Sequence, residues 1–222
     1  MGYDTTASTI SSACYLLALN PDKQEKLYEE IIKVIEELKN ESEDNETDPL
    51  KLVSFDSLHR FKYLDAVINE ALRLLGPVAT VERRAAKDIV LATEDGRISI
   101  NVKKNDVIRV PMYYIHHSER FYKDPNSFVP ERFLNSNDYN KFTFMPFGLG
   151  PRRCLATLLA QLEVKLALIH TIRNYKLTKA PNTKVNSKFQ YSTRIKPFSF
   201  YYAGSIGFLR SIRFPDCQRN LS

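Results

Sequence analysis

The sequence lacks tryptophan and has few of the residues that define specialised architectures. It contains three cysteines, seven glycines and eleven prolines among 222 residues. Three cysteines in a chain of this length cannot form a disulfide framework, so a reducing compartment is the default expectation. The low glycine and proline content excludes collagen-like and low-complexity character. The length suits one domain, or two small ones, with a sizeable core.

Long hydrophobic runs are also missing. The longest early apolar run, residues 13–19, is much shorter than the roughly 20 residues that cross a bilayer. No secretory signal peptide follows Met1, so the sequence offers neither an anchor nor a leader. Apolar residues recur at helical spacing from Ala7 to Ala18 with no start signal before them. We therefore expect the chain to begin inside a helix of a longer protein.

Dense basic runs are absent as well, although the net charge is +6 and the pI is about 9.1. Residues 21–50 hold eleven acidic and four basic side chains, a net charge of −7, which leaves +13 on the rest of the chain. Because that basic excess is spread out, it favours an interaction face over a nucleic-acid-binding arm. We expect no nucleic-acid partner.

Hydrophobic periodicity predicts a mainly helical protein with a small β region. Asn20 is the expected N-cap of a second helix that starts with Pro21, and Asp95-Gly96 is the expected hairpin turn. The helices are predicted up to residue 19 and at 21–39, 62–75 and 155–172, with one or two helical turns within 112–121; the strands are predicted at 80–84, 89–92, 98–102 and 107–110. The long segment 122–149 lacks periodicity, and its phenylalanines predict an ordered, buried path: Phe128, Phe133, Phe142, Phe144 and Phe147.

Residues 147–156 carry the strongest chemical signal. Two glycines and a proline precede a predicted helix, and Cys154 lies at its N-terminus beside Arg152 and Arg153. A helix N-terminus and nearby cations favour the thiolate, so we expect a lowered thiol pKa. Such a thiolate can act as a nucleophile, in redox chemistry or as a ligand of a soft metal. A buried, inert cysteine is the simpler alternative.

The other residues near this cysteine limit its chemistry. No Cys or His flanks it at zinc-site spacing, and no second cysteine completes a C-x-x-C redox pair. A nucleophile would need a histidine base that the sequence alone does not place beside it. Haem iron requires only one protein thiolate. Haem is therefore the interpretation that needs the fewest residues beyond those the sequence places near Cys154.

Phe147-x-x-Gly150-x-Arg152-x-Cys154-x-Ala156 resembles the haem-binding signature of the cytochrome P-450 monooxygenases. The resemblance implies that Cys154 is the axial ligand of the haem iron, within a cofactor-binding loop that includes Phe147 and Gly150. It also implies that Arg152 pairs with a haem propionate. The family usually has glycine where Ala156 stands, a change that reduces close approach to the haem and keeps the ligand.

Two further motifs occur in the family's order. Glu70-x-x-Arg73 resembles the family's Glu-x-x-Arg motif, and Pro130-Glu131-Arg132-Phe133 resembles the element in which Arg132 joins Glu70 and Arg73 to fix the loop behind the haem. Taken alone, Glu70 and Arg73 are better interpreted as an ordinary surface pair at i,i+3 spacing. The order of the motifs before the cysteine loop favours the family role.

Less firmly anchored matches give further candidate residues. Residues 2–6 resemble the oxygen-activation segment of the family, in which Asp4 and Thr5 would deliver protons to bound dioxygen; helix capping is the simpler interpretation in isolation. Arg84 aligns with a second propionate partner. Ala79 and Thr80 fall where the family's substrate-contact strand begins.

The resemblance implies the C-terminal, haem-binding portion of a microsomal-type cytochrome P-450, incomplete at the N-terminus, as a single partial domain. Residues 2–195 match the family and residues 197–222 diverge. The implied reaction inserts one oxygen atom of O2 into a hydrophobic small-molecule substrate, with electrons from an NADPH-dependent reductase. Membrane association is expected of the full-length protein, at the cytosolic face of the endoplasmic reticulum. The expected reductase-docking residues are Lys141, Arg152, Arg153 and Lys165.

Two alternatives remain open at this point. The chain could be a truncated, non-catalytic fragment that binds haem weakly or not at all, an interpretation that Met1 inside a helix favours. It could also be a cysteine-dependent enzyme without haem, in which the thiolate is the nucleophile.

Overall fold

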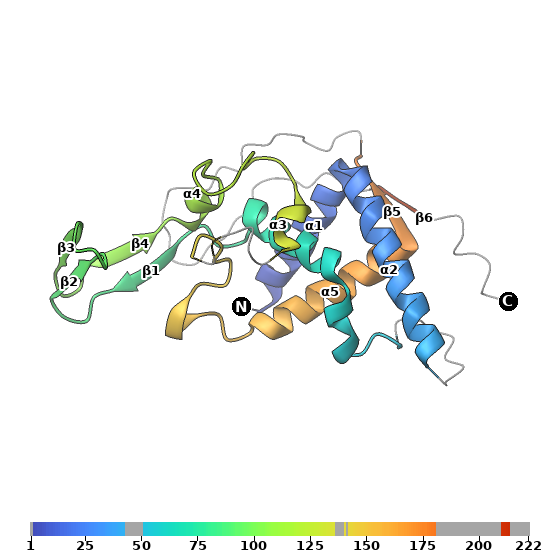
Figure 1. Ribbon diagram of the computed structural model, residues 1–222, viewed down its shortest axis with the longest axis horizontal. Coiled ribbons are helices and arrows are strands. Elements are labelled where there is room, and N and C mark those ends of the chain that lie inside the picture. Colours follow the sequence, from blue (N-terminus) through green and yellow to red (C-terminus); the bar gives the residue numbers. More distant parts are fainter. Residues whose placement is uncertain (1, 43–50, 136–139, 141, 181–209, 214–222) are drawn as a thin grey trace.

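The computed structural model describes residues 2–42, 51–135, 140, 142–180 and 210–213. Figure 1 shows a group of helices from which strands β1–β4 extend as an arm to one side. This arrangement confirms the predicted mainly helical class with a small β region. The helices are α1 (Gly2–Leu19), α2 (Pro21–Glu41), α3 (Lys62–Leu75), α4 (Met112–His116) and α5 (Thr157–Asn174), with 3₁₀ turns η1 (Asp56–Arg60), η2 (Pro130–Phe133) and η3 (Gly150–Arg152).

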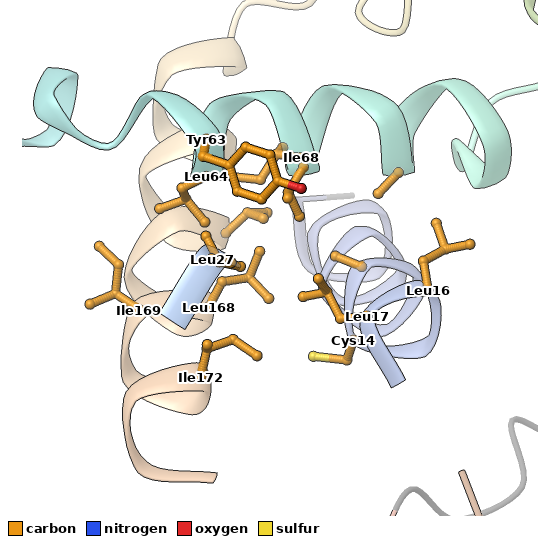
Figure 2. Close-up of a cluster of buried hydrophobic side chains, with 14 of the residues drawn as sticks. Cys14, Leu16, Leu17, Leu27, Tyr63, Leu64, Ile68, Leu168, Ile169 and Ile172 are labelled. Atoms are coloured by element: carbon orange, nitrogen blue, oxygen red, sulfur yellow. The ribbon is translucent and has the colours of Figure 1, made fainter. Parts of the chain in front are cut away.

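The core lies where α1, α2, α3 and α5 meet. Helix α1 packs against both α3 and α5, and α2 packs against α5. Figure 2 shows side chains of these helices pointing toward one another, and several of them are completely buried: Leu17, Leu27, Leu64, Leu168 and Ile172. Burying each such side chain stabilises the fold by roughly 2 kcal/mol. The core therefore fixes α5, and with it the cysteine that precedes this helix.

The junction between α1 and α2 differs in detail from the prediction. Pro21 opens α2 as expected, but the Asn20 side chain makes no N-cap hydrogen bond. Its amide instead donates to the carbonyl of Leu16, at 2.7 Å, because the last carbonyls of α1 also lack helical partners. The carbonyl of Asn20 accepts the amides of Lys23 and Gln24.

The β arm consists of two antiparallel strand pairs. One pair joins β1 (Val81–Arg84) to β4 (Val107–Val110), and the other, at the far end of the arm in Figure 1, joins β2 (Ile89–Ala92) to β3 (Ser99–Val102). The turn at Gly96 has φ +67°, which glycine adopts without strain. All four predicted strands are confirmed to within one residue, whereas the pairing of β1 with β4 was not predicted.

Three further differences concern the C-terminal half. Helix α5 begins at Thr157 rather than at residue 155. Phe142 is 77% exposed, so the prediction that it is buried is wrong, although Phe128 and Phe133 are buried as expected. Strand β5 (Tyr175–Thr178) pairs antiparallel with β6 (Arg210–Arg213), a pairing that the weak alternation of the tail did not predict.

Candidate functional site

The loop before α5 is held by its own backbone. The amide of Cys154 donates to the carbonyl of Phe147 at 2.9 Å, and the amide of Arg153 donates to the carbonyl of Gly150 at 3.0 Å. Gly148 and Gly150 both have φ +74°, a left-handed conformation that residues with a side chain rarely adopt. The glycines noted in the sequence are therefore what allows the loop to fold back on itself.

The thiol of Cys154 lies on the surface at the end of this loop. Its residue is exposed, in contrast to the buried Cys14. The Thr157 hydroxyl donates to the Cys154 carbonyl at 2.8 Å, which links the loop to the first residue of α5. Leu155 and Leu158 beside it are 102% and 71% exposed. The exposed cysteine therefore has exposed apolar residues close to it in the sequence.

These residues form the donor set that a thiolate-ligated haem requires. Cys154 would supply an accessible sulfur as the iron ligand, and Leu155 and Leu158 would supply apolar surface for the macrocycle. Arg152 and Arg153 are exposed and can offer guanidinium groups to the propionates. Phe147 packs against the main core and so anchors the loop. The residues present fit the group.

The other predicted site residues lie on different elements. Asp4 is exposed and Thr5 is half-buried, both in the first turn of α1. Helix α1 as a whole packs against α5. In Figure 1 the first turns of α1 and α5 lie at the same end of the helical group. Arg84 is exposed on β1 and donates to the carbonyl of Asn105 at 3.4 Å.

Glu70 and Arg73 form a buried ion pair, which excludes the surface pair considered above. Their side chains are 0% exposed. The Arg73 Nε and Nη2 atoms donate to the two carboxylate oxygens of Glu70, each at 2.8 Å. Arg132 Nε donates to Glu70 Oε1 at 3.1 Å. The expectation that Arg132 joins this pair is confirmed.

The remaining donors of Arg73 hold the backbone of the following loop. Nη1 donates to the carbonyls of His116 and Pro125 at 2.6 and 2.7 Å, and Nη2 donates to that of Ser127 at 3.3 Å. Arg132 extends the pattern to the carbonyl of Lys123, at 3.0 Å. A buried charge is tolerated when its hydrogen bonds are satisfied, and the cluster meets this condition while fixing a segment without regular structure.

A second set of contacts fixes η2 from the side of α2. Lys26 and Lys23 donate to Glu131 Oε1 at 2.9 and 3.2 Å, and the Tyr63 hydroxyl donates to the same atom at 3.1 Å. Burial of the carboxyl group opposes ionisation, but these lysines lower the pKa of Glu131 to about 2. Two adjacent residues of η2 are therefore held by other helices. Glu131 is bound by side chains of α2 and α3, and Arg132 by Glu70 of α3.

His116, which is 4% exposed, contributes to the pH dependence of stability. Burial and the charge of Arg73 lower its pKa from 6.5 to about 4. The unfolded chain takes up this proton near pH 6.5 and the folded chain does so only near pH 4. The free energy of unfolding should therefore fall by about 3 kcal/mol between these pH values. Urea titrations at half-unit pH steps measure the slope. His116→Gln should flatten it, and an unchanged slope would contradict the assignment.

One of the expected reductase-docking lysines, Lys165, does not serve that prediction. Lys165 is only 9% exposed and bonds to Asp65 at 2.7 Å and to the carbonyl of Leu58 at 3.3 Å. Its position on the inner face of α5 directs its charge to α3 rather than to a partner, so this prediction is wrong. Lys141 lies outside the described residues. Arg152 and Arg153 are exposed and remain candidates.

Sequence reasoning missed residues that connect the cluster to the cysteine loop. His116 Nε2 accepts the amide of Met145 at 3.2 Å, and the Tyr122 hydroxyl donates to the carbonyl of Thr143 at 3.1 Å. Neither residue belongs to a motif. The aromatic residues of segment 122–149 indicated burial, but no pattern in the sequence indicates these particular partners.

Comparisons with known proteins extend this picture. The sequence model of the family described as Cytochrome P450 matches residues 1–200. The chain is 37% identical over 182 residues to "Probable cytochrome P450 9h1" of Drosophila melanogaster, covering 82% of this chain and 33% of that protein. It is 35% identical over 198 residues to "Cytochrome P450 3A31" of Mesocricetus auratus, covering 88% and 36% respectively. The chain therefore spans about a third of the length of these curated relatives.

Within the part of the chain that the structure describes, no helix combines the length and hydropathy that a bilayer span needs.

Proposed function

Since the chain belongs to the cytochrome P450 family, we propose that it is the haem-binding portion of a haem-thiolate monooxygenase. The observation that carries the proposal is the exposed Cys154 at the end of a loop that its own backbone holds. The buried cluster of Glu70, Arg73 and Arg132 supports it, because the cluster fixes the segment that leads toward that loop.

Each residue of the site has a proposed role. Cys154 would ligate the haem iron through its thiolate, with Phe147 and Gly150 shaping its loop, and Arg152 and Arg84 would pair with the propionates. Asp4 and Thr5, at the start of α1, would supply protons for the reaction. When bound, the haem supplies the redox chemistry by which one oxygen atom is transferred to substrate.

The partners belong to the same proposal. Electrons would come from an NADPH-dependent reductase that docks near the exposed Arg152 and Arg153, where positive charge accelerates encounter with an acidic surface. The substrate would be a hydrophobic small molecule near Ala79 and Thr80. The whole protein would associate with the cytosolic face of the endoplasmic reticulum membrane.

The absorption spectrum of the haem-supplemented chain, reduced and treated with carbon monoxide, tests the proposal. We expect a thiolate-type band, complete loss of that band in Cys154→Ala, and retention of the band in Cys217→Ala. The cysteine-replaced variants should keep the far-ultraviolet circular dichroism of the starting chain.

A folded chain without the band would contradict the proposal. The result would then favour the alternative in which this chain is a fragment that binds haem weakly or not at all. A band that survives Cys154→Ala would show that another group ligates the iron.

A further inference from the structure

Two buried residues connect the Arg73 cluster to the segment that precedes the cysteine loop. The carbonyl of His116 accepts Arg73 Nη1 at 2.6 Å, while Nε2 of the same residue accepts the amide of Met145 at 3.2 Å. The Tyr122 ring lies 5.0 Å from the Arg73 guanidinium carbon, and its hydroxyl donates to the carbonyl of Thr143 at 3.1 Å. His116 and Tyr122 thus each contact Arg73 and also the backbone of the segment that holds Thr143 and Met145.

From this segment the hydrogen bonds continue to the cysteine. The carbonyl of Met145 accepts the amide of Gly148 at 2.9 Å, and the carbonyl of Phe147 accepts the amide of Cys154 at 2.9 Å. The backbone between Met145 and Cys154 is therefore tied at both ends. Met145 therefore belongs to the hydrogen-bonded turn that leads into the Cys154 loop.

The contact of His116 requires a neutral ring. Nε2 can accept the Met145 amide only when the ring proton is on Nδ1, because a protonated imidazole has no acceptor. Burial and the charge of Arg73 lower the pKa of His116 to about 4. The acceptor is therefore present at neutral pH.

We propose that His116 and Tyr122 are positioning residues that hold the Cys154 loop against the buried Arg73 cluster. The proposal deepens the function given above and rests on it for its haem-dependent part. The ion-pair cluster then acts on the Cys154 loop through these two residues, in addition to the backbone of residues 116–127 that it binds directly. Neither residue contacts the thiol.

The alternative is that both residues only fill the core, since His116 and Tyr122 are 4% and 3% exposed. Three substitutions separate these roles. Tyr122→Phe removes one hydroxyl and keeps the ring over Arg73. His116→Leu removes the acceptor, and His116→Gln restores a carbonyl oxygen near the position of Nε2. Tyr114→Phe, at a residue that is 72% exposed, is the matched control.

The first measurement needs no haem. Hydrogen exchange of the Met145 amide, in the full chain at pH 7, should be roughly five- to tenfold faster in His116→Leu, the effect of losing one hydrogen bond. His116→Gln should restore slow exchange, and Tyr114→Phe should leave it unchanged. Unchanged exchange in a folded His116→Leu protein would overturn the proposal.

The second measurement uses the haem-loaded chain. Tyr122→Phe and His116→Leu should convert part of the thiolate-type band to the form without thiolate, and His116→Gln should recover it. A full thiolate band in both variants would overturn the positioning role. If the unsubstituted chain gives no band at all, the proposed function fails, while faster Met145 exchange would still support the attachment of the loop.

Discussion

Replacing Arg73 by leucine is expected to lower the free energy of unfolding by about 3–5 kcal/mol, the usual cost of removing one partner of a buried ion pair. The substitution leaves the carboxylate of Glu70, which is 0% exposed, without its bidentate partner. It also removes the donor from the carbonyls of His116 and Pro125. Urea denaturation followed by circular dichroism measures the difference.

A matched control is available on the surface. Arg60 donates through Nη1 and Nη2 to the two oxygens of Glu41, each at 2.8 Å, which is also a bidentate ion pair but lies in an accessible place. Solvent screens such a pair, so Arg60→Leu should change stability little. Equal losses at Arg60 and Arg73 would mean that burial does not determine the cost.

The second large effect is expected at Gln24, which is 1% exposed. Its amide nitrogen donates to the carbonyls of Leu17 and Leu177, at 3.2 and 2.9 Å, and its oxygen accepts the amide of Leu177, at 2.7 Å. Gln24→Leu leaves the buried groups of Leu177 without these partners. We expect a loss of about 3 kcal/mol in the free energy of unfolding.

Gln161→Leu, the same exchange at a half-buried position of α5, is the control and should have a smaller effect. Equilibrium urea curves of both variants give the comparison. If Gln24→Leu were as stable as the original chain, the bonds from α2 to β5 would contribute nothing net to folding.

The sequence predicted the elements well because their signals are local. The apolar spacing of α3 and the Asp95-Gly96 turn each depend on neighbouring residues, and both are confirmed. The pairing of β1 with β4 escaped prediction because more than twenty residues separate the partners Val81 and Val110. Contacts between distant segments leave no periodic pattern in a sequence.

The same distinction applies to the site. Cys154 and the Glu70–Arg73 pair could be identified from motifs, yet spacing alone favoured a surface ion pair, and only the structure shows that the pair is buried. Lys165 was misassigned because a lysine on an apolar helix is expected to project into solvent. Asp65 supplies the partner that keeps it inside, and no local signal indicates this.

The β arm has a practical consequence for anyone who handles this chain. Strands β2 and β3 pair only with each other within the described part of the chain, and Val90, Ile98 and Ile100 are each about 60% exposed. Open strand edges with accessible apolar side chains are templates for intermolecular sheet extension. Sample concentration therefore becomes an experimental variable, and spectra and denaturation curves should agree across a dilution series before they are interpreted as properties of a monomer.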